Sequence, residues 1–272
     1  MPPVPTFAID DATDSRLAEY QNVSDPDLAR RRGVFVAEGR LVVSRLLTAT
    51  ALPVRSLMVT APALESLRPD LHVRPEVPVY LVPPATMNVV AGFNIHRGCL
   101  AIGERPAPRD WRVLAASGRR AVALERLGDA DNVGSVFRGA AALGAAFVLL
   151  GPGCADPLYR KAIRTSMGAV LSLPYAHAEP WPAALTVLRE EGWAVVGTTP
   201  SRQARPVREV AHDVAQRPVL VVVGHEGTGL TAEALAACEH LARIPITDRV
   251  DSLNVATAAA IALYEMQRDT DR

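Results

Sequence analysis

Arg138 is an isolated charge in a long apolar stretch, and its chemistry is the first question that the sequence raises. It is the only formally charged residue between Asp131 and Asp156, in the run NVGSVFRGAAALGAAFVLLGPGCA. A run this rich in Ala, Val and Leu predicts a buried helix followed by a buried strand. Burying an unpaired guanidinium costs several kcal/mol. We therefore expect Arg138 to have a partner or to reach a cleft that an anionic ligand enters.

Two further loops carry isolated polar residues. Glu226, in VVVGHEGTGLT, is the only formal charge between Arg217 and Glu233, and three glycines surround it. No lysine follows these glycines, so the loop is not a P-loop. Asn254, in VDSLNVATAAAIALYE, stands at the head of an apolar helix. Polar groups that converge in an apolar pocket are typical of a ligand site, but these residue types do not name the ligand.

The same residues also have a purely structural interpretation. Asn is among the best residues for the N-cap of a helix, so Asn132 is a candidate cap for the helix that carries Arg138. Asp251 or Ser252 is a candidate cap for the last helix, with Asn254 in its first turn. Glycine permits the close approach of another backbone, and the loop around Glu226 could be no more than a tight turn between a strand and a helix.

Composition narrows the class of protein. The 272 residues are 49% hydrophobic and 21% charged, and 29 basic residues balance 29 acidic ones. Such a chain is globular, and its neutral charge gives no support to a strongly basic nucleic-acid binder, although it leaves room for a basic patch. Three cysteines without a CxxC pair indicate neither a zinc site nor a disulfide framework, which fits a reducing cytoplasm. We expect no metal.

The ends and the apolar runs bear on localisation. The opening MPPVPTFAIDDATDSR lacks the basic and apolar regions of a signal peptide. No continuous apolar run is long enough to span a membrane. These features predict a soluble cytoplasmic protein.

Elements that could position the polar loops alternate along the chain. The proline-containing segment near residues 106–118 reads as a linker or a domain edge, which divides the chain into domains 1–110 and 111–272. Before it, short strands and a helix predict a small α/β domain: strands at 35–39, 54–61, 77–83 and 98–104, and a helix at 40–49. After it, strands and helices alternate, as in a parallel sheet with helices on both faces: strands at 120–127, 146–151, 193–199, 218–224 and 242–246, and helices at 133–144, 180–192, 231–240 and 253–267.

The three polar loops, in this order, resemble the three motifs of the SpoU/TrmH family of RNA ribose methyltransferases, in the SPOUT superfamily. The first motif has the form NxGxxxR, the second GxEGxGL and the third IPxxxxxxSLNV. They are matched here by Asn132, Gly134 and Arg138, by Gly224, Glu226, Gly227, Gly229 and Leu230, and by Ile244, Pro245, Ser252, Leu253, Asn254 and Val255. RKAIRTSMGAVLSLPY, FVAEGRLVVSRLL and HRGCLAIGE are also similar to family segments, whereas roughly the first 30 residues match poorly.

The resemblance implies a fold, a cofactor and an assembly. The C-terminal domain would be a SPOUT domain, an α/β fold whose parallel sheet contains a deep trefoil knot, which is an exception to the rule that chains avoid knots. The N-terminal domain would be a small α/β substrate-recognition domain that resembles a ribosomal-protein fold. Family members are homodimers, and they bind S-adenosylmethionine in the knot.

The resemblance also implies site residues and a reaction, the methylation of a ribose 2'-hydroxyl in RNA. The implied catalytic residues are Arg138, Asn132, Glu226, Ser252 and Asn254. The implied cofactor-binding residues are Thr198, Gly224, Ile244 and Leu253, with Thr199 nearby. A recognition domain of about 100 residues favours rRNA over tRNA as the partner. The alternative is a non-catalytic RNA-binding protein that retains the fold.

Basic residues outside the motifs are candidate phosphate contacts. The run Arg30–Arg32 and the group Arg160, Lys161 and Arg164 are the clearest clusters. Binding through them would depend on salt. An ordinary solvated surface explains the same residues.

Overall fold

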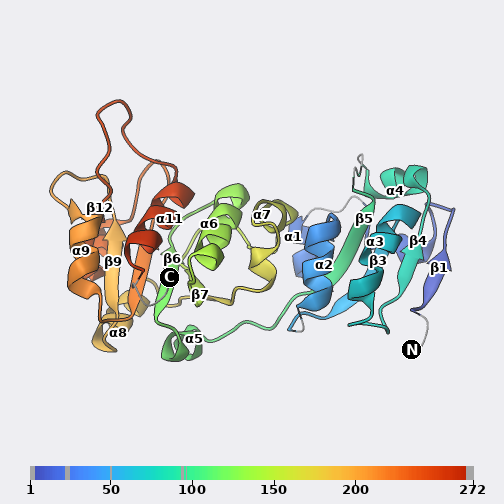
Figure 1. Ribbon diagram of the computed structural model, residues 1–272, viewed down its shortest axis with the longest axis horizontal. Coiled ribbons are helices and arrows are strands. Elements are labelled where there is room, and N and C mark those ends of the chain that lie inside the picture. Colours follow the sequence, from blue (N-terminus) through green and yellow to red (C-terminus); the bar gives the residue numbers. More distant parts are fainter. Residues whose placement is uncertain (1–3, 22–24, 50, 93–94, 96, 268–272) are drawn as a thin grey trace. The chain divides into compact units, whose positions relative to one another are not determined.

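A computed structural model describes residues 4–21, 25–49, 51–92, 95 and 97–267 (Figure 1). The chain forms two compact units. The N-terminal unit comprises Met1–Ala107 together with Leu158–Ser172, and the C-terminal unit comprises Pro108–Pro157 together with Leu173–Arg272. A short segment of the second half of the chain therefore belongs to the first unit.

The N-terminal unit is built on a mixed five-stranded sheet of order β1-β4-β3-β5-β2. Its strands are β1 (Thr6–Ala8), β2 (Val34–Glu38), β3 (Val54–Val59), β4 (Val79–Leu81) and β5 (Cys99–Glu104). Its helical segments are η1 (Ser15–Leu17), α1 (Asp25–Asp27), η2 (Leu28–Arg32), α2 (Arg40–Thr48), α3 (Ala61–Leu71), α4 (Pro84–Ala91), α7 (Arg160–Thr165) and η3 (Ala169–Leu171). β5 pairs antiparallel with both β2 and β3, while β4 pairs parallel with β3 and β1. The predicted strands and the predicted helix of this unit are confirmed.

Two polar contacts attach the segment Leu158–Ser172 to the rest of the N-terminal unit. The backbone N–H and the Nε of Arg160 donate to the carboxylate of Asp25 at 2.9 and 2.8 Å. Nη1 of Arg45 donates to the carbonyl oxygen of Met167 at 2.6 Å. Arg160, one of the candidate phosphate contacts, is thus held by an acidic partner of its own chain.

The C-terminal unit contains a seven-stranded sheet of order β10-β12-β9-β11-β6-β7-β8, and every pair in it is parallel. Its strands are β6 (Arg120–Leu124), β7 (Phe147–Leu150), β8 (Tyr175–His177), β9 (Ala194–Thr198), β10 (Arg205–Pro206), β11 (Val219–Val223) and β12 (His240–Arg243). Its helices are α5 (Trp111–Ser117), α6 (Ala130–Ala142), α8 (Ala183–Glu190), α9 (Val207–Val214), α10 (Ala232–Ala237) and α11 (Val255–Glu265). The predicted parallel sheet is confirmed.

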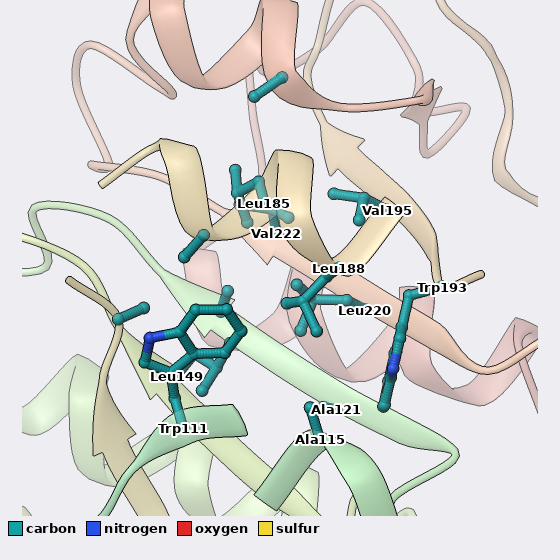
Figure 2. Packing of buried hydrophobic residues seen from close by; sticks show 14 of the residues in the cluster. Trp111, Ala115, Ala121, Leu149, Leu185, Leu188, Trp193, Val195, Leu220 and Val222 are labelled. Carbon is teal, nitrogen blue, oxygen red and sulfur yellow. The ribbon is translucent and has the colours of Figure 1, made fainter. Parts of the chain in front are cut away.

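Both faces of this sheet are buried. Successive side chains of a strand point to opposite faces, so neighbouring buried residues of one strand lie on different faces. On β11, Leu220 and Val222 lie in a core with α5, α8 and α10. Figure 2 shows Leu220 and Val222 in this core together with Leu188 and Trp193. The intervening Val221 is also fully buried, on the opposite face. There α11 contacts β11, α6 and α9, and Figure 1 shows α6 and α11 side by side.

Two boundaries in this unit differ from the prediction. Residues 106–118 were expected to be a linker or a domain edge, but within them Trp111–Ser117 forms α5, which Asp110 caps by accepting from the backbone N–H of Arg112 at 2.9 Å. The helix forms because Trp111 and Ala115 are buried one turn apart against the sheet. The strand expected at 242–246 instead begins at His240 and ends at Arg243, since Pro245 has no N–H to donate to a ladder.

Two features are absent from the described residues. None of the helices in the described ranges is both long and apolar enough to cross a membrane. Within the same ranges, no group of three or more His, Cys, Asp or Glu residues lies in an arrangement that could hold a metal ion.

Candidate active site

The three polar loops leave the sheet at one edge, because parallel neighbouring strands end together. Val223, the last residue of β11, lies opposite Leu124, the last residue of β6. Val222 of β11 lies opposite Gly197 of β9. Ligands of parallel α/β sheets bind at the carboxyl ends of the strands, and all predicted site residues lie at this edge or on the helices that begin there.

Asn132, Glu226 and Asn254 form a hydrogen-bonded group, called here the amide–carboxylate cluster. Nδ2 of Asn132 donates to Oε1 of Glu226 at 2.6 Å. Nδ2 of Asn254 donates to Oδ1 of Asn132 at 3.0 Å and to Oε1 of Glu226 at 3.2 Å. One residue from each polar loop is thus joined, across sequence separations of 94, 122 and 28 residues. Glu226 is exposed, so the cluster can meet a ligand.

The starts of two helices position the amides of this cluster. Asp129 caps α6 by accepting from the backbone N–H of Asp131 at 2.9 Å, so Asn132 lies in the first turn. Asn254 itself caps α11, because its Oδ1 accepts from the backbone N–H groups of Ala256 and Thr257 at 2.9 and 3.3 Å. The predictions that Asn132, and Asp251 or Ser252, cap these helices are therefore wrong. With its cap role assigned to Asp129, the side chain of Asn132 remains available to Glu226.

The loop between β11 and α10 folds back on its own first residue. A Cβ on Gly224 would lie 2.5 Å from the backbone of Gly229 and Leu230, so only glycine fits there. Nδ1 of His225 accepts from the backbone N–H groups of Gly227 and Thr228 at 2.9 and 3.2 Å. The imidazole of His225 therefore closes the turn that presents Glu226.

Glu125 is a buried carboxylate that the sequence analysis did not single out. It is 1% exposed. Its Oε1 accepts from Nε1 of Trp181 at 2.7 Å and from Oγ1 of Thr231 at 2.8 Å, and its Oε2 accepts from the backbone N–H of Thr231 at 2.8 Å. Thr231 also caps α10. The charge inside the apolar run RAVALERL was the signal that could have found Glu125.

Arg138 and Ser252 lie outside the cluster. The helical period buries Val133, Val136, Phe137 and Ala140 against the sheet, and it leaves Arg138 exposed on the outer side of α6. The apolar stretch thus does not bury Arg138, and no described residue accepts a hydrogen bond or an ion pair from its guanidinium, so the partner that was expected for it is not found among the described residues. Ser252 is also exposed and is not joined to the cluster. Both side chains face solvent at the site.

The predicted cofactor residues lie on the β12, β9 and β11 side of the same edge. Thr198 ends β9, and its Oγ1 donates to the carbonyl oxygen of Val222 at 3.1 Å. Ile244 and Leu253 are half-buried and flank the third loop, while Gly224 begins the second. Residues 245–253 belong to no helix or strand.

Comparison with known proteins decides the family. The model of the SpoU rRNA Methylase family matches residues 119–264. The chain belongs to this family. The SpoU match covers more than half of the chain and includes β6, all three polar loops and nearly all of α11.

Relatives of the SpoU chain are similar over nearly its whole length. An uncharacterised tRNA/rRNA methyltransferase of Mycobacterium bovis is 42% identical over 95% of this chain and 90% of its own. A 23S rRNA (guanosine(2553)-2'-O)-methyltransferase of Bacillus subtilis is 24% identical over 95% of this chain and 98% of its own. The crystal structure of an AdoMet-bound rRNA methyltransferase from Sinorhizobium meliloti superposes with a TM-score of 0.81, at 26% identity, over 96% and 97% of the two chains.

The SpoU chain is accordingly an RNA 2'-O-ribose methyltransferase, and S-adenosylmethionine (AdoMet) is bound in structures of its relatives. The residues at the β12, β9 and β11 edge fit that cofactor. An adenine ring carries hydrogen-bond donors and acceptors that backbone N–H and C=O groups can meet, and residues 245–253 present backbone that no helix or strand ladder uses. Half-buried Ile244 and Leu253 add apolar surface beside them.

Proposed function

We propose that this enzyme methylates a ribose 2'-hydroxyl in ribosomal RNA rather than in tRNA. A recognition unit of about 100 residues precedes the SpoU region, and so large a unit suits a large folded RNA better than a small one. The Bacillus subtilis and Sinorhizobium meliloti relatives, which align over almost their whole length, are rRNA methyltransferases by name. In this proposal residues 1–110 bind RNA, and residues 111–272 carry the methyltransferase site.

The amide–carboxylate cluster is the observation that carries the assignment of the site. In our proposal it fixes three loops in one geometry, so that the donor and the ribose meet in line. Orientation of this kind can contribute on the order of 7–11 kcal/mol when reacting atoms are held about 3 Å apart. Bound AdoMet would supply an electrophilic methyl group, and Thr198, Gly224, Ile244 and Leu253 would hold it beside the cluster. Ser252 would contact the target ribose.

In this proposal Arg138 is an electrostatic catalyst. A guanidinium has five donors and no acceptor, so Arg138 cannot take the proton of the 2'-hydroxyl. Two parallel hydrogen bonds to the adjacent phosphate would hold the nucleotide and place positive charge near the oxygen that becomes negative. The hydroxyl proton would then pass to solvent. Exposure of Arg138 suits this role because a bound RNA can reach it.

Two parts of the proposal follow from the resemblance to the family. We propose that the enzyme acts as a homodimer, in which the partner's surface lies near Arg138. The trefoil knot likewise stays a prediction. Light scattering of the pure protein would test the first, with a mass of twice 29.0 kDa expected.

Methyl transfer to defined RNA pools tests the proposed function. The pure enzyme is incubated with methyl-labelled AdoMet and with rRNA or tRNA transcribed in vitro, which carries no earlier modification. We expect label in rRNA only, at a position that resists alkaline cleavage, because a 2'-O-methyl group blocks attack of that oxygen on the neighbouring phosphate. Label only in tRNA would overturn the choice of substrate. Binding of AdoMet and RNA without transfer to rRNA, tRNA or ribosomal subunits would favour the non-catalytic alternative.

A further inference from the structure

Arg126 has a backbone conformation that a long side chain rarely adopts. Its φ is 60°, and among the described residues only Met167, with φ 55°, is another non-glycine residue in the left-handed region. That region brings the Cβ of an L-residue against its own carbonyl group, so it is unfavourable for arginine and free of strain for glycine. Strain of this kind persists at functional sites more than elsewhere. The packing of the fold therefore does not explain why an arginine, and not a glycine, stands at this position.

The neighbours of Arg126 fix its backbone from both sides. The N–H of Arg126 donates to the carbonyl oxygen of Pro152 at 2.9 Å, and the carbonyl oxygen of Arg126 accepts from the N–H of Gly128 at 3.0 Å. Directly before it, Glu125 is held by its three buried hydrogen bonds. The position is thus built into the edge of the sheet and does not move with a loose loop.

The side chain of Arg126 has an anchored base and an exposed head. A Cβ built on Gly153 would lie 3.4 Å from Cγ of Arg126, so the first methylene groups lie against the loop that follows β7. The residue is exposed as a whole. Its guanidinium makes no hydrogen bond or ion pair with any described residue. A charged head that is held out to solvent from a rigid base is suited to an anionic partner.

The strand order places Arg126 on the β6 and β7 side of the proposed cofactor site. Thr198 ends β9, and Gly224 and Ile244 follow β11 and β12, whereas Arg126 follows β6, the neighbour of β11, and contacts the loop after β7. The amide–carboxylate cluster is built from the loop after β11 and the helices that begin beside it. Arg126 lies in the segment between β6 and α6, and α6 carries Asn132 of the cluster, so Arg126 extends the site towards β7.

We propose that Arg126 binds a backbone phosphate of the RNA beside the target nucleotide. The planar guanidinium matches a phosphate with two parallel hydrogen bonds. The contact would fix the strand in register with the donor, at the cost of a strained backbone. This inference rests on the proposed function, because it takes the same RNA as the substrate.

The strain itself provides a sharp experiment. Arg126→Gly removes the charge and relieves the left-handed conformation, so the variant should have a melting temperature no lower than that of the wild type. We expect its KM for the methylated RNA to rise about tenfold, with AdoMet affinity unchanged. One phosphate contact fewer should also make the slope of log affinity against log salt shallower by about 0.7–0.9. Arg126→Lys, which keeps the charge, should restore part of the affinity.

Arg119→Gln is the matched control. Arg119 is also exposed, and it precedes β6 at the opposite end of the same strand, so its loss should leave KM and the salt slope unchanged. Wild-type KM and salt slope in Arg126→Gly would overturn the inference, as would an equal loss of AdoMet binding. If the wild type transferred no methyl group to any RNA, the proposed function would fail, and binding of in vitro transcribed rRNA in a salt series would still test Arg126.

Discussion

Glu125 and Glu226 are two carboxylates at one edge of the C-terminal sheet, and both hold the loop between β11 and α10. Glu125 is 1% exposed and accepts from the indole of Trp181 and from the hydroxyl and backbone N–H of Thr231. Glu226 is exposed and accepts from the side-chain amides of Asn132 and Asn254. The loop is thus anchored in the interior at its end and at the surface in its middle.

The difference in burial between the two carboxylates predicts which of them supports the stability of the fold and which supports catalysis. A buried acceptor that is removed leaves its donors without water to replace it, so the full desolvation penalty appears in the free energy of unfolding. An exposed acceptor can be replaced by water at little cost to the fold. We therefore expect changes at Glu125 to lower stability, and changes at the exposed residues to lower methyl transfer instead.

Arg138→Ala should give the largest effect. The effect should fall on methyl transfer and not on stability, as expected for an exposed residue. Loss of one donor to developing negative charge lowers kcat by about 100- to 1000-fold. The melting temperature should not change, because the guanidinium contacts no described partner, and AdoMet affinity should stay within a few-fold. Single-turnover transfer and calorimetric AdoMet binding measure the two quantities. An equal loss of AdoMet binding would make Arg138 structural.

Glu125→Gln and Glu226→Gln form a matched pair that tests the comparison directly. At position 125 the new amide has one acceptor oxygen where the carboxylate has two, so in either orientation its N–H groups face a donor of Trp181 or Thr231, and we expect a loss of about 1–3 kcal/mol in the free energy of unfolding. At position 226 the loss should stay below about 0.5 kcal/mol, with slower transfer. Urea denaturation of both variants measures the two free energies of unfolding. Equal destabilisation would contradict the assignment of stability to Glu125 and of catalysis to Glu226.

Asn254 should affect both stability and methyl transfer, because its Oδ1 caps α11 while its Nδ2 donates to the cluster. Asn254→Ala should cost about 1 kcal/mol of stability through the lost cap and should also slow transfer. Asn254→Asp keeps a capping oxygen but loses the donor to Glu226. It should be more stable than the alanine variant and transfer no faster. Recovery of transfer in Asn254→Asp would show that the donor is not needed.

His225 offers the smallest effect and refines the comparison within the loop itself. Oδ1 of an asparagine stands at the same number of bonds from the backbone as Nδ1 of histidine, so His225→Asn should keep the turn and change stability by less than about 0.5 kcal/mol. His225→Ala loses both hydrogen bonds to the turn and should cost about 0.5–1.5 kcal/mol. Thermal unfolding measures both, and identical melting temperatures would show that the imidazole does not support the loop.

The regular elements around the site could be predicted because their patterns are local. The run VLVVVG, apolar on both faces, is typical of a strand in the middle of a parallel sheet, and it forms β11 between β9 and β6. The period of VGSVFRGAAALG likewise predicted α6. The same period placed Arg138 on the outer side, so its exposure was readable, but the apolar composition of the stretch outweighed the period in our interpretation.

The sequence by itself determined the three polar loops, their order and the elements that carry them, because turns, caps and apolar periods depend on near neighbours. It also identified the residue types on which a ribose methyltransferase site would depend. Only the tertiary structure decided which of them meet. Asn132, Glu226 and Asn254 come together because β6 and β11 are adjacent and parallel and because α11 packs against α6. The buried anchor of Glu125 and the left-handed backbone of Arg126 have the same origin, since long-range packing selects both.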